Sequence, residues 1–205
     1  MYTNDWFSGN IGNWERILAE FKGKPNLRFL EIGCYEGKAT HWLCSNILTD
    51  RTSTITVVDT FAGSIEHEKL APTDFSVVET NFRENLAEFI RTDKVDIYKS
   101  ESQKYLREIS GAVFNVIYVD GSHVAKDVLE DSVLAWKLLK ENGIMIFDDV
   151  EWDAYQEPVL NPKLAVNSFL EVYRYRYELL HKDYQVAIRK NEKDFNKKTA
   201  SNNSQ

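Results

Sequence analysis

The chain has 205 residues, 43% hydrophobic and 28% charged, which is the composition of a globular protein with room for one substantial core. Its formal net charge of −7 argues against broad nucleic-acid binding, because that activity needs a basic face. No apolar run reaches the roughly 18 residues of a membrane span, no secretory signal begins the chain, and its two cysteines form no C-x-x-C pair, so we expect a cytoplasmic protein.

The amino-terminal part of the chain predicts a short amphipathic helix from about Asn13 to Phe21. The run Gly23-Lys24-Pro25 follows and would end this helix before the first strand. We expect residues 1–27 to form a helical lid, which either covers the edge of a sheet or contacts a substrate.

Five short apolar runs then alternate with helical stretches. Several runs are almost continuously apolar, which is typical of strands buried on both faces of a parallel sheet. The alternation predicts right-handed crossovers and a doubly wound sheet. The predicted strands are 28–33, 54–59, 94–98, 114–120 and 143–147, and the predicted helices are 38–48, 75–91, 102–109 and 123–141.

The carboxyl-terminal part departs from this alternation. Two strand-like runs, 176–181 and 184–189, are joined by only Lys182-Asp183. So short a link allows a hairpin but no parallel crossover, and we therefore expect an antiparallel strand at the end of the sheet. The result is one α/β domain over residues 1–190, with seven mostly parallel strands and helices on both faces. Residues 191–205 are polar and predict a disordered tail.

Polar or acidic residues follow each of the five predicted parallel strands. In an open α/β sheet, ligands bind beyond the carboxyl ends of the strands. One acidic strand end is usually only a helix cap, but five such ends at one edge are more than packing alone would select. In strand order, the candidates are Glu31, Gly33, Tyr35, Gly37 and Thr40; Asp59; Ser102 and Gln103; Asp120 and His123; Asp148 and Asp149.

The first of these strand ends carries a glycine turn but no dinucleotide fingerprint. Gly33 and Gly37 are spaced G-x-x-x-G, and Tyr35 stands where the middle glycine of G-x-G-x-x-G would be. This difference speaks against a nicotinamide cofactor. Asp59 ends the second strand, where a carboxylate can bind both hydroxyls of a ribose, so any cofactor that contains adenosine would suit it.

Three aspartates at the last two parallel strand ends predict a metal site. If Asp120, Asp148 and Asp149 converge within about 4 Å, each pair of carboxylates repels by roughly 4 kcal/mol at an effective dielectric near 20. A cation or protonation must relieve this repulsion, and all-oxygen ligands favour Mg²⁺ or Mn²⁺ over zinc. The alternative is that these residues only cap the following helix and turn.

The run from Glu31 to Thr40, together with the three later aspartate sites, resembles the class I S-adenosylmethionine-dependent methyltransferases. Within them it is similar to the metal-dependent O-methyltransferases of small molecules, both the catechol type and the type that acts on macrolide sugars. The resemblance runs from about Phe29 to Asp149. It implies a Rossmann-like methyltransferase domain over residues 1–190 and methyl transfer to a hydroxyl of a sugar or phenol.

The resemblance also implies a role for each candidate residue. The methionine part of the cofactor would lie among Gly33, Tyr35 and Thr40, and Gly37 would bind the cofactor as part of the same turn. Glu31 would support the turn, Asp59 would hold the ribose, and Ser102 and Gln103 would lie beside the adenine. A magnesium or manganese ion would be bound by Asp120, Asp148 and Asp149. The catechol enzymes have a lysine base near the position of His123, and the sugar enzymes have a histidine thereabouts. His123 and Asp120 are therefore the implied catalytic residues, with Asp120 also bordering the cofactor.

Two other interpretations stay open. The first is an oxidoreductase with a nucleotide cofactor on a similar sheet, and the second is a cofactor-binding module without turnover. His123 itself is either the general base or only a residue at the start of a helix. The expected partners are a small hydroxylated acceptor, with no nucleic acid and no membrane.

Overall fold

The computed structural model describes residues 2–65 and 74–192. The chain divides into two compact units. Unit 1 comprises Met1–Tyr105 with Asp120–Ser122, and unit 2 comprises Leu106–Val119 with His123–Gln205.

Unit 1 contains three parallel strands, as predicted. They are β1 (Arg28–Ile32), β2 (Thr54–Asp59) and β3 (Val95–Lys99). Ile32 pairs with Val58, and Asp59 pairs with Lys99, so the carboxyl ends of the three strands lie at the same edge. The helices of this unit are α1 (Ile11–Ile17), α2 (Lys38–Asn46), α4 (Phe75–Asn85), α5 (Ala87–Arg91) and the start of α6 (Ser102–Glu108), with 3₁₀ turns at Ser8–Asn10 and Ala19–Phe21.

The amino-terminal helix differs slightly from its predicted bounds. It begins at Ile11 and gives way at Leu18 to the 3₁₀ turn that ends with Phe21. Its anchor is Trp14, a fully buried ring that meets Phe7 and Trp42 edge-on. The lid role of this segment remains a prediction.

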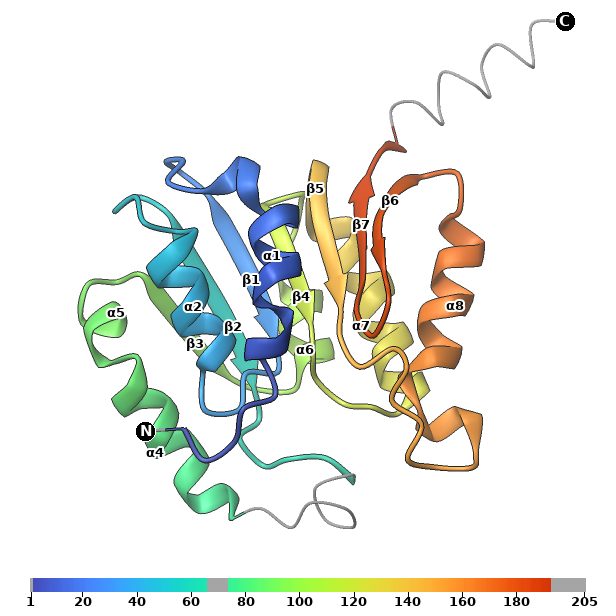
Figure 1. Cartoon of the computed structure of the whole chain (residues 1–205), viewed down its shortest axis with the longest axis horizontal. Helices are drawn as coiled ribbons and strands as arrows, with labels where there is room; N and C mark the ends of the chain where they lie inside the picture. Colours follow the sequence, from blue (N-terminus) through green and yellow to red (C-terminus); the bar gives the residue numbers. More distant parts are fainter. Residues whose placement is uncertain (1, 66–73, 193–205) are drawn as a thin grey trace, which may run out of the picture. The chain divides into compact units, whose positions relative to one another are not determined.

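Unit 2 contains the other four strands. They are β4 (Phe114–Val119), β5 (Leu139–Phe147), β6 (Tyr177–Lys182) and β7 (Val186–Lys190). β4 and β5 are parallel, whereas β7 is antiparallel to both β5 and β6, which confirms the predicted hairpin and antiparallel end. The helices are α7 (Ala125–Leu138), which packs against β4 and β5, and α8 (Pro162–Tyr173), which lies beside α7, with a 3₁₀ turn at Pro158–Leu160 (Figure 1).

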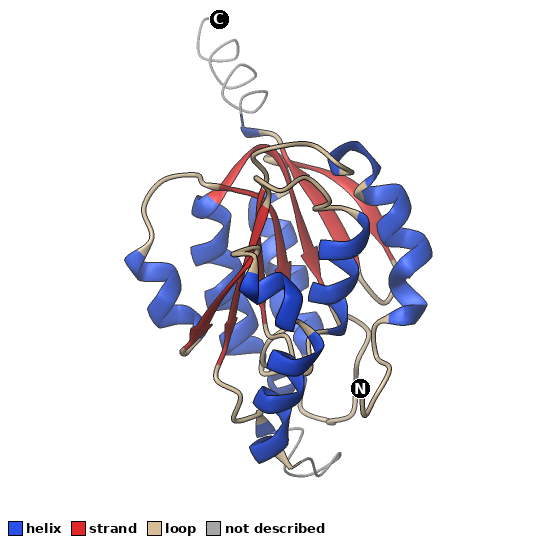
Figure 2. Ribbon diagram, turned by 90° about the vertical axis from the view of Figure 1, so that its left-hand side faces the viewer, coloured by secondary structure: helices blue, strands red, loops and turns tan. Residues whose placement is uncertain are grey.

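The seven strands follow the order β3-β2-β1-β4-β5-β7-β6. From β1 the chain runs outward to β3, and from β4 it runs outward in the opposite direction, which is the predicted doubly wound arrangement. Helices flank the strands in both units (Figure 2). No helix in the described ranges is long and apolar enough to cross a membrane.

The helix predicted over 123–141 is shorter at both ends than the sequence indicated. α7 begins at Ala125, and the backbone is already extended at Leu139, where β5 begins. The buried ammonium group of Lys190 on β7 donates hydrogen bonds to the carbonyl oxygens of Trp136 and Leu139. In a longer helix these two carbonyl oxygens would accept hydrogen bonds from backbone N–H groups of the next turn. Here Lys190 satisfies them instead, and the polar residues 140–142 belong to β5.

Two further differences concern helices. The stretch predicted as one helix over 75–91 is divided into α4 and α5 at the buried Leu86. α8 was not predicted at all, although Pro162 in its first turn and the buried Ala165, Val166, Phe169 and Leu170 follow helical spacing. Of the predicted tail, residues 193–205 lie outside the described residues.

Candidate active site

The turn after β1 takes the left-handed conformation at three residues. The φ angles are 79° at Gly33, 48° at Tyr35 and 79° at Gly37. A Cβ at Gly33 would lie 2.0 Å from the carbonyl oxygen of Asp120, whose own N–H donates to Ile32. The sequence predicted a close approach of this turn to a ligand, and the structure shows a close approach to the backbone that ends β4.

Asp59 fixes this turn from the end of β2. Its Oδ2 accepts the backbone N–H groups of Cys34 at 2.7 Å and Tyr35 at 3.3 Å. Its Oδ1 accepts the N–H of Phe61 at 2.7 Å. A carboxylate offers about four acceptor sites, so these three backbone bonds leave about one acceptor site on Asp59.

Glu31 and Thr40 form a buried pair behind the turn. Glu31 is 1% exposed, and its Oε2 accepts the Thr40 hydroxyl at 2.6 Å. Burial, assisted by the charge of Asp59, raises the pKa of Glu31 to about 8. Thr40 therefore donates to a carboxyl group that is mostly protonated at neutral pH. The role of Glu31 in supporting the turn stays a prediction.

The adenine candidates lie at the same edge of unit 1. Ser102 and Gln103 begin α6, directly after β3. The N–H of Ser100, just before them, donates to the carbonyl oxygen of Asp59. Cys34 is buried within the turn, and burial raises the pKa of its thiol, which agrees with a packing role.

Asp148 follows β5, and its backbone N–H donates to Val119 at the end of β4. Its Oδ2 accepts the hydroxyl of Tyr118 and the amide of Gln185, and its Oδ1 accepts the N–H of Asp149. Loss of water and the charge of Asp149 raise the pKa of Asp148 to about 6. This carboxyl group is therefore held by the strands and the hairpin turn of unit 2.

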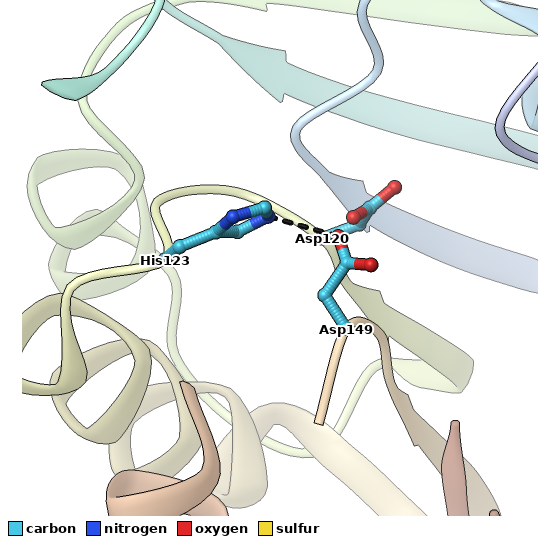
Figure 3. A group of neighbouring side chains, drawn as sticks. All are labelled: Asp120, His123 and Asp149. Atoms are coloured by element: carbon cyan, nitrogen blue, oxygen red, sulfur yellow. Dashed lines mark ion pairs between the residues drawn. The ribbon is translucent and has the colours of Figure 1, made fainter. Parts of the chain in front are cut away.

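The carboxylate of Asp149 takes a different direction, because this residue has a φ of 54°. Its Oδ2 lies 2.8 Å from Nε2 of His123, as the dashed line in Figure 3 marks. The ring of Trp152 meets the imidazole edge-on with centroids 4.5 Å apart, and its backbone N–H donates to the carbonyl of Asp149. Tyr155 follows, with its ring centroid 5.6 Å from that of Trp152.

Three residues form a candidate cation site. Asp120, His123 and Asp149 each offer one ligand atom, and these atoms all lie within 4.8 Å of one another (Figure 3). Asp120 directly follows Val119, the last residue of β4. The donor set of two carboxylates and an imidazole fits a divalent cation. Of the three predicted cation ligands, Asp120 and Asp149 belong to this group, and His123 stands in the place that was expected for Asp148.

Some residues that shape these sites were not singled out from the sequence. Tyr118 and Gln185, which hold Asp148, come from strand and turn positions with no signal of their own. The buried Glu36 binds partners that are 33 and 45 residues away along the chain. No local spacing could have indicated these contacts.

The comparisons with known proteins agree with this architecture. A family model described as a methyltransferase domain matches residues 30–150. No curated protein matches the sequence.

Many solved structures share the fold at low sequence identity. A protein from Clostridium thermocellum described as an rRNA methylase is 16% identical, with a TM-score of 0.63, over 93% of this chain and 98% of its own. An O-methyltransferase from Bacillus cereus in complex with S-adenosylhomocysteine (SAH) is 17% identical, with a TM-score of 0.60, over 92% and 84%. The MycE methyltransferase of mycinamycin biosynthesis, in complex with Mg, SAH and mycinamycin VI, is 15% identical, with a TM-score of 0.60, over 91% and 50%.

Proposed function

The chain belongs to the methyltransferase domain family, and we propose that it transfers a methyl group from S-adenosylmethionine to a hydroxyl oxygen of a small molecule, with the help of a divalent cation. The observation that carries this proposal is the group formed by Asp120, His123 and Asp149, which joins two carboxylates to an imidazole. A base and an electrostatic stabiliser for a developing alkoxide or phenoxide are what transfer to oxygen requires.

The cofactor would bind in unit 1. When bound, S-adenosylmethionine supplies a methyl group that its sulfonium sulfur makes electrophilic. The turn from Gly33 to Gly37 would border the methionine part, and the remaining acceptor site of Asp59 would take a ribose hydroxyl. Ser102 and Gln103 would lie beside the adenine. SAH in the solved structures of the same fold supports this assignment.

Asp120 and Asp149 would hold a magnesium or manganese ion. Such an ion, when bound, acts as a Lewis acid and a template for the acceptor oxygen. Asp148 was the third predicted ligand, but its carboxyl group accepts hydrogen bonds from Tyr118, Gln185 and the N–H of Asp149. We therefore assign Asp148 to positioning the turn in which Asp149 stands. The magnesium in the MycE structure supports the presence of an ion.

His123 would serve as the general base. Its Nε2 faces the carboxylate of Asp149, which orients the imidazole toward the ends of β4 and β5. Trp152 packs edge-on against the ring, with the two ring centroids 4.5 Å apart. With Asp149 bound to the cation, Nε2 would be released from this carboxylate, and the neutral imidazole would accept the proton of the acceptor hydroxyl, so that the oxygen attacks as an anion.

The net charge of −7 disfavours an RNA substrate, although one solved structure of this fold is described as an rRNA methylase. The other two interpretations are an oxidoreductase and a module without turnover. Separate calorimetric titrations with SAH, NAD and magnesium distinguish them. We expect SAH and magnesium to bind and NAD to give no heat. Binding of NAD without SAH would contradict the proposal, and so would SAH binding without turnover on any hydroxylated acceptor.

A further inference from the structure

A buried carboxylate lies in the middle of the turn proposed to bind the cofactor. Glu36 is 1% exposed, although nothing in the proposed chemistry uses it. It accepts three hydrogen bonds, from the N–H of Thr3 at 2.6 Å, the hydroxyl of Thr3 at 2.9 Å and the amide of Asn81 at 2.7 Å. A buried charge is costly unless it is fully hydrogen-bonded, so these partners are required for the fold of the turn.

The bonds of Glu36 join three separate parts of unit 1. Thr3 belongs to the amino-terminal segment, which passes α4 in Figure 1, and Asn81 lies on α4 itself. The carbonyl oxygen of Glu36 also accepts the side-chain amide of Asn85, on the same helix. One residue therefore ties the amino terminus, the turn and α4 together.

The remaining residues of the amino-terminal segment contact the same turn. The hydroxyl of Tyr35 is hydrogen-bonded to the side chains of Thr3 and Asn4, and its ring lies 4.7 Å from that of Trp6. Asp5 forms a salt bridge with Lys38, 2.5 Å long. We call residues 3–6 the amino-terminal clasp.

The backbone of the turn explains why such a clasp is needed. Tyr35, with a φ of 48°, takes a left-handed conformation that costs a non-glycine residue free energy. A residue keeps such a conformation only when its surroundings hold it there. Glu36 directly follows Tyr35, and the clasp bonds both side chains.

We propose that the amino-terminal clasp is part of the cofactor site and that Glu36 is a positioning residue, which holds the turn after β1 in the conformation that binds the methionine part of the cofactor. This inference rests on the proposed function. If the clasp favours the turn conformation that binds the cofactor, then cofactor binding must stabilise the clasp by the same free energy, because the coupling between two equilibria is reciprocal.

The hydroxyl of Tyr2 supports a role in binding. It is buried and has no hydrogen-bond partner among the described residues. Burial and the charge of Glu36 raise the pKa of Tyr2 to about 12, so the hydroxyl keeps its proton. The centroid of the Tyr2 ring lies 5.5 Å from Nζ of Lys38, the residue that directly follows the turn, so this unsatisfied donor belongs to the surroundings of the turn and could be satisfied by a ligand bound there.

The test is SAH affinity, measured by calorimetry, in a Glu36→Gln variant. The glutamine amide would bring its NH₂ group against the donors of Thr3 or Asn81, so the turn would lose at least one charge-assisted bond. We expect the dissociation constant to rise about 10- to 100-fold. Glu79→Gln is the matched control, because Glu79 lies on α4 and pairs only at the surface with Arg83 and Lys99. This control should change the constant less than about twofold.

A second variant separates positioning from general loss of structure. Adding Asn81→Asp to Glu36→Gln exchanges donor and acceptor, so the glutamine can donate to the aspartate and still accept from Thr3. This double variant should recover most of the lost affinity. In the unchanged protein, SAH should slow hydrogen exchange at the amide of Thr3, and this effect should be absent from Glu36→Gln.

A folded Glu36→Gln protein that binds SAH as tightly as the unchanged chain would overturn the inference while leaving the proposed function intact. If Glu36→Gln does not fold, SAH affinity is measured instead in Thr3→Val and in a variant that lacks residues 2–6. Unchanged SAH affinity in both variants would overturn the inference. Failure of the unchanged chain to bind SAH would instead overturn the proposed function, and this inference with it.

Discussion

The Nε2 atom of His123 lies 2.8 Å from Oδ2 of Asp149, so the candidate base and a candidate cation ligand hold each other in place. His123 precedes α7, whereas Asp149 follows β5, and only the folding of unit 2 brings them together. Trp152, three residues after Asp149, closes over the imidazole. The candidate base and this candidate cation ligand therefore come from the segments that follow two neighbouring parallel strands, β4 and β5.

Replacement of the candidate base should reduce turnover and leave cofactor binding intact. We expect His123→Ala to lower kcat by roughly 10²- to 10⁴-fold, the usual effect of losing a general base. SAH affinity should stay the same, because the cofactor residues belong to unit 1. Steady-state kinetics with an acceptor from a screen of phenols and sugars measures the first effect, and calorimetry measures the second.

His41→Ala is the control for this variant, because His41 packs against Phe89 on α5. It should keep normal kcat. If His123→Ala also keeps near-normal kcat and an unchanged acidic limb of the pH–rate profile, His123 has a structural role only.

Removal of a cation ligand should abolish manganese binding, observed by electron paramagnetic resonance. Asp120→Asn and Asp149→Asn each take away a negative charge from the candidate site, and we expect both to lose the bound signal. Glu151→Gln, a nearby surface residue paired with Lys163, should keep it. Manganese binding that persists in Asp149→Asn would remove this residue from the site.

Asp148→Asn separates a ligand from a positioning residue. Because the carboxyl group of Asp148 is held by Tyr118 and Gln185, we expect the variant to retain manganese binding with an affinity reduced about tenfold or less. Complete loss of binding, equal to that of Asp149→Asn, would restore Asp148 as the third ligand that the sequence predicted.

Asp59→Ala should weaken SAH binding by about 10- to 100-fold. The variant loses the proposed ribose contact and also releases the backbone N–H groups of Cys34 and Phe61. Calorimetry checks this value, with Asp96→Ala on the exposed face of β3 as the control. Equal affinities of Asp59→Ala and the unchanged chain would exclude Asp59 from the cofactor site.

Glu31 makes stability depend on pH. Its pKa is about 8 in the folded chain against 4.5 ordinarily, so between these values the folded state binds more protons than the unfolded state. Stability should therefore fall as pH rises from about 4.5 to 8. Glu31→Gln keeps an acceptor for Thr40 and should reduce this fall by on the order of a few kcal/mol. Denaturant unfolding at pH 5 and pH 8 measures it, and equal slopes of stability against pH in both proteins would contradict the assignment.

The sheet could be predicted because burial on both faces leaves a nearly continuous apolar run, as in 114–119, where only Asn115 is polar. The hairpin followed from the two-residue link before Tyr184. The prediction was wrong where long-range contacts overrode local pattern: Lys190 ends α7 early by bonding the carbonyls of Trp136 and Leu139.

For the candidate site, the sequence predicted which residues lie at the strand ends but not the contacts of their side chains. Strand ends indicated which acidic residues gather at one edge, because that depends on topology alone. The direction of each side chain was not predictable, since the positive φ of Asp149 turns it toward His123 while Asp148 faces Tyr118. The contacts of Glu36 with Thr3 and Asn81 likewise depend on folding and have no local signature.

The most direct test of the account is methyl transfer from isotope-labelled S-adenosylmethionine to a panel of phenols and sugars, with and without a chelator. We expect at least one acceptor to gain a labelled methyl ether, with one SAH released for each ether. An excess of chelator should abolish the reaction, and added Mg²⁺ or Mn²⁺ should restore it. Full activity in excess chelator, or a labelled methyl group on an atom other than oxygen, would contradict the account.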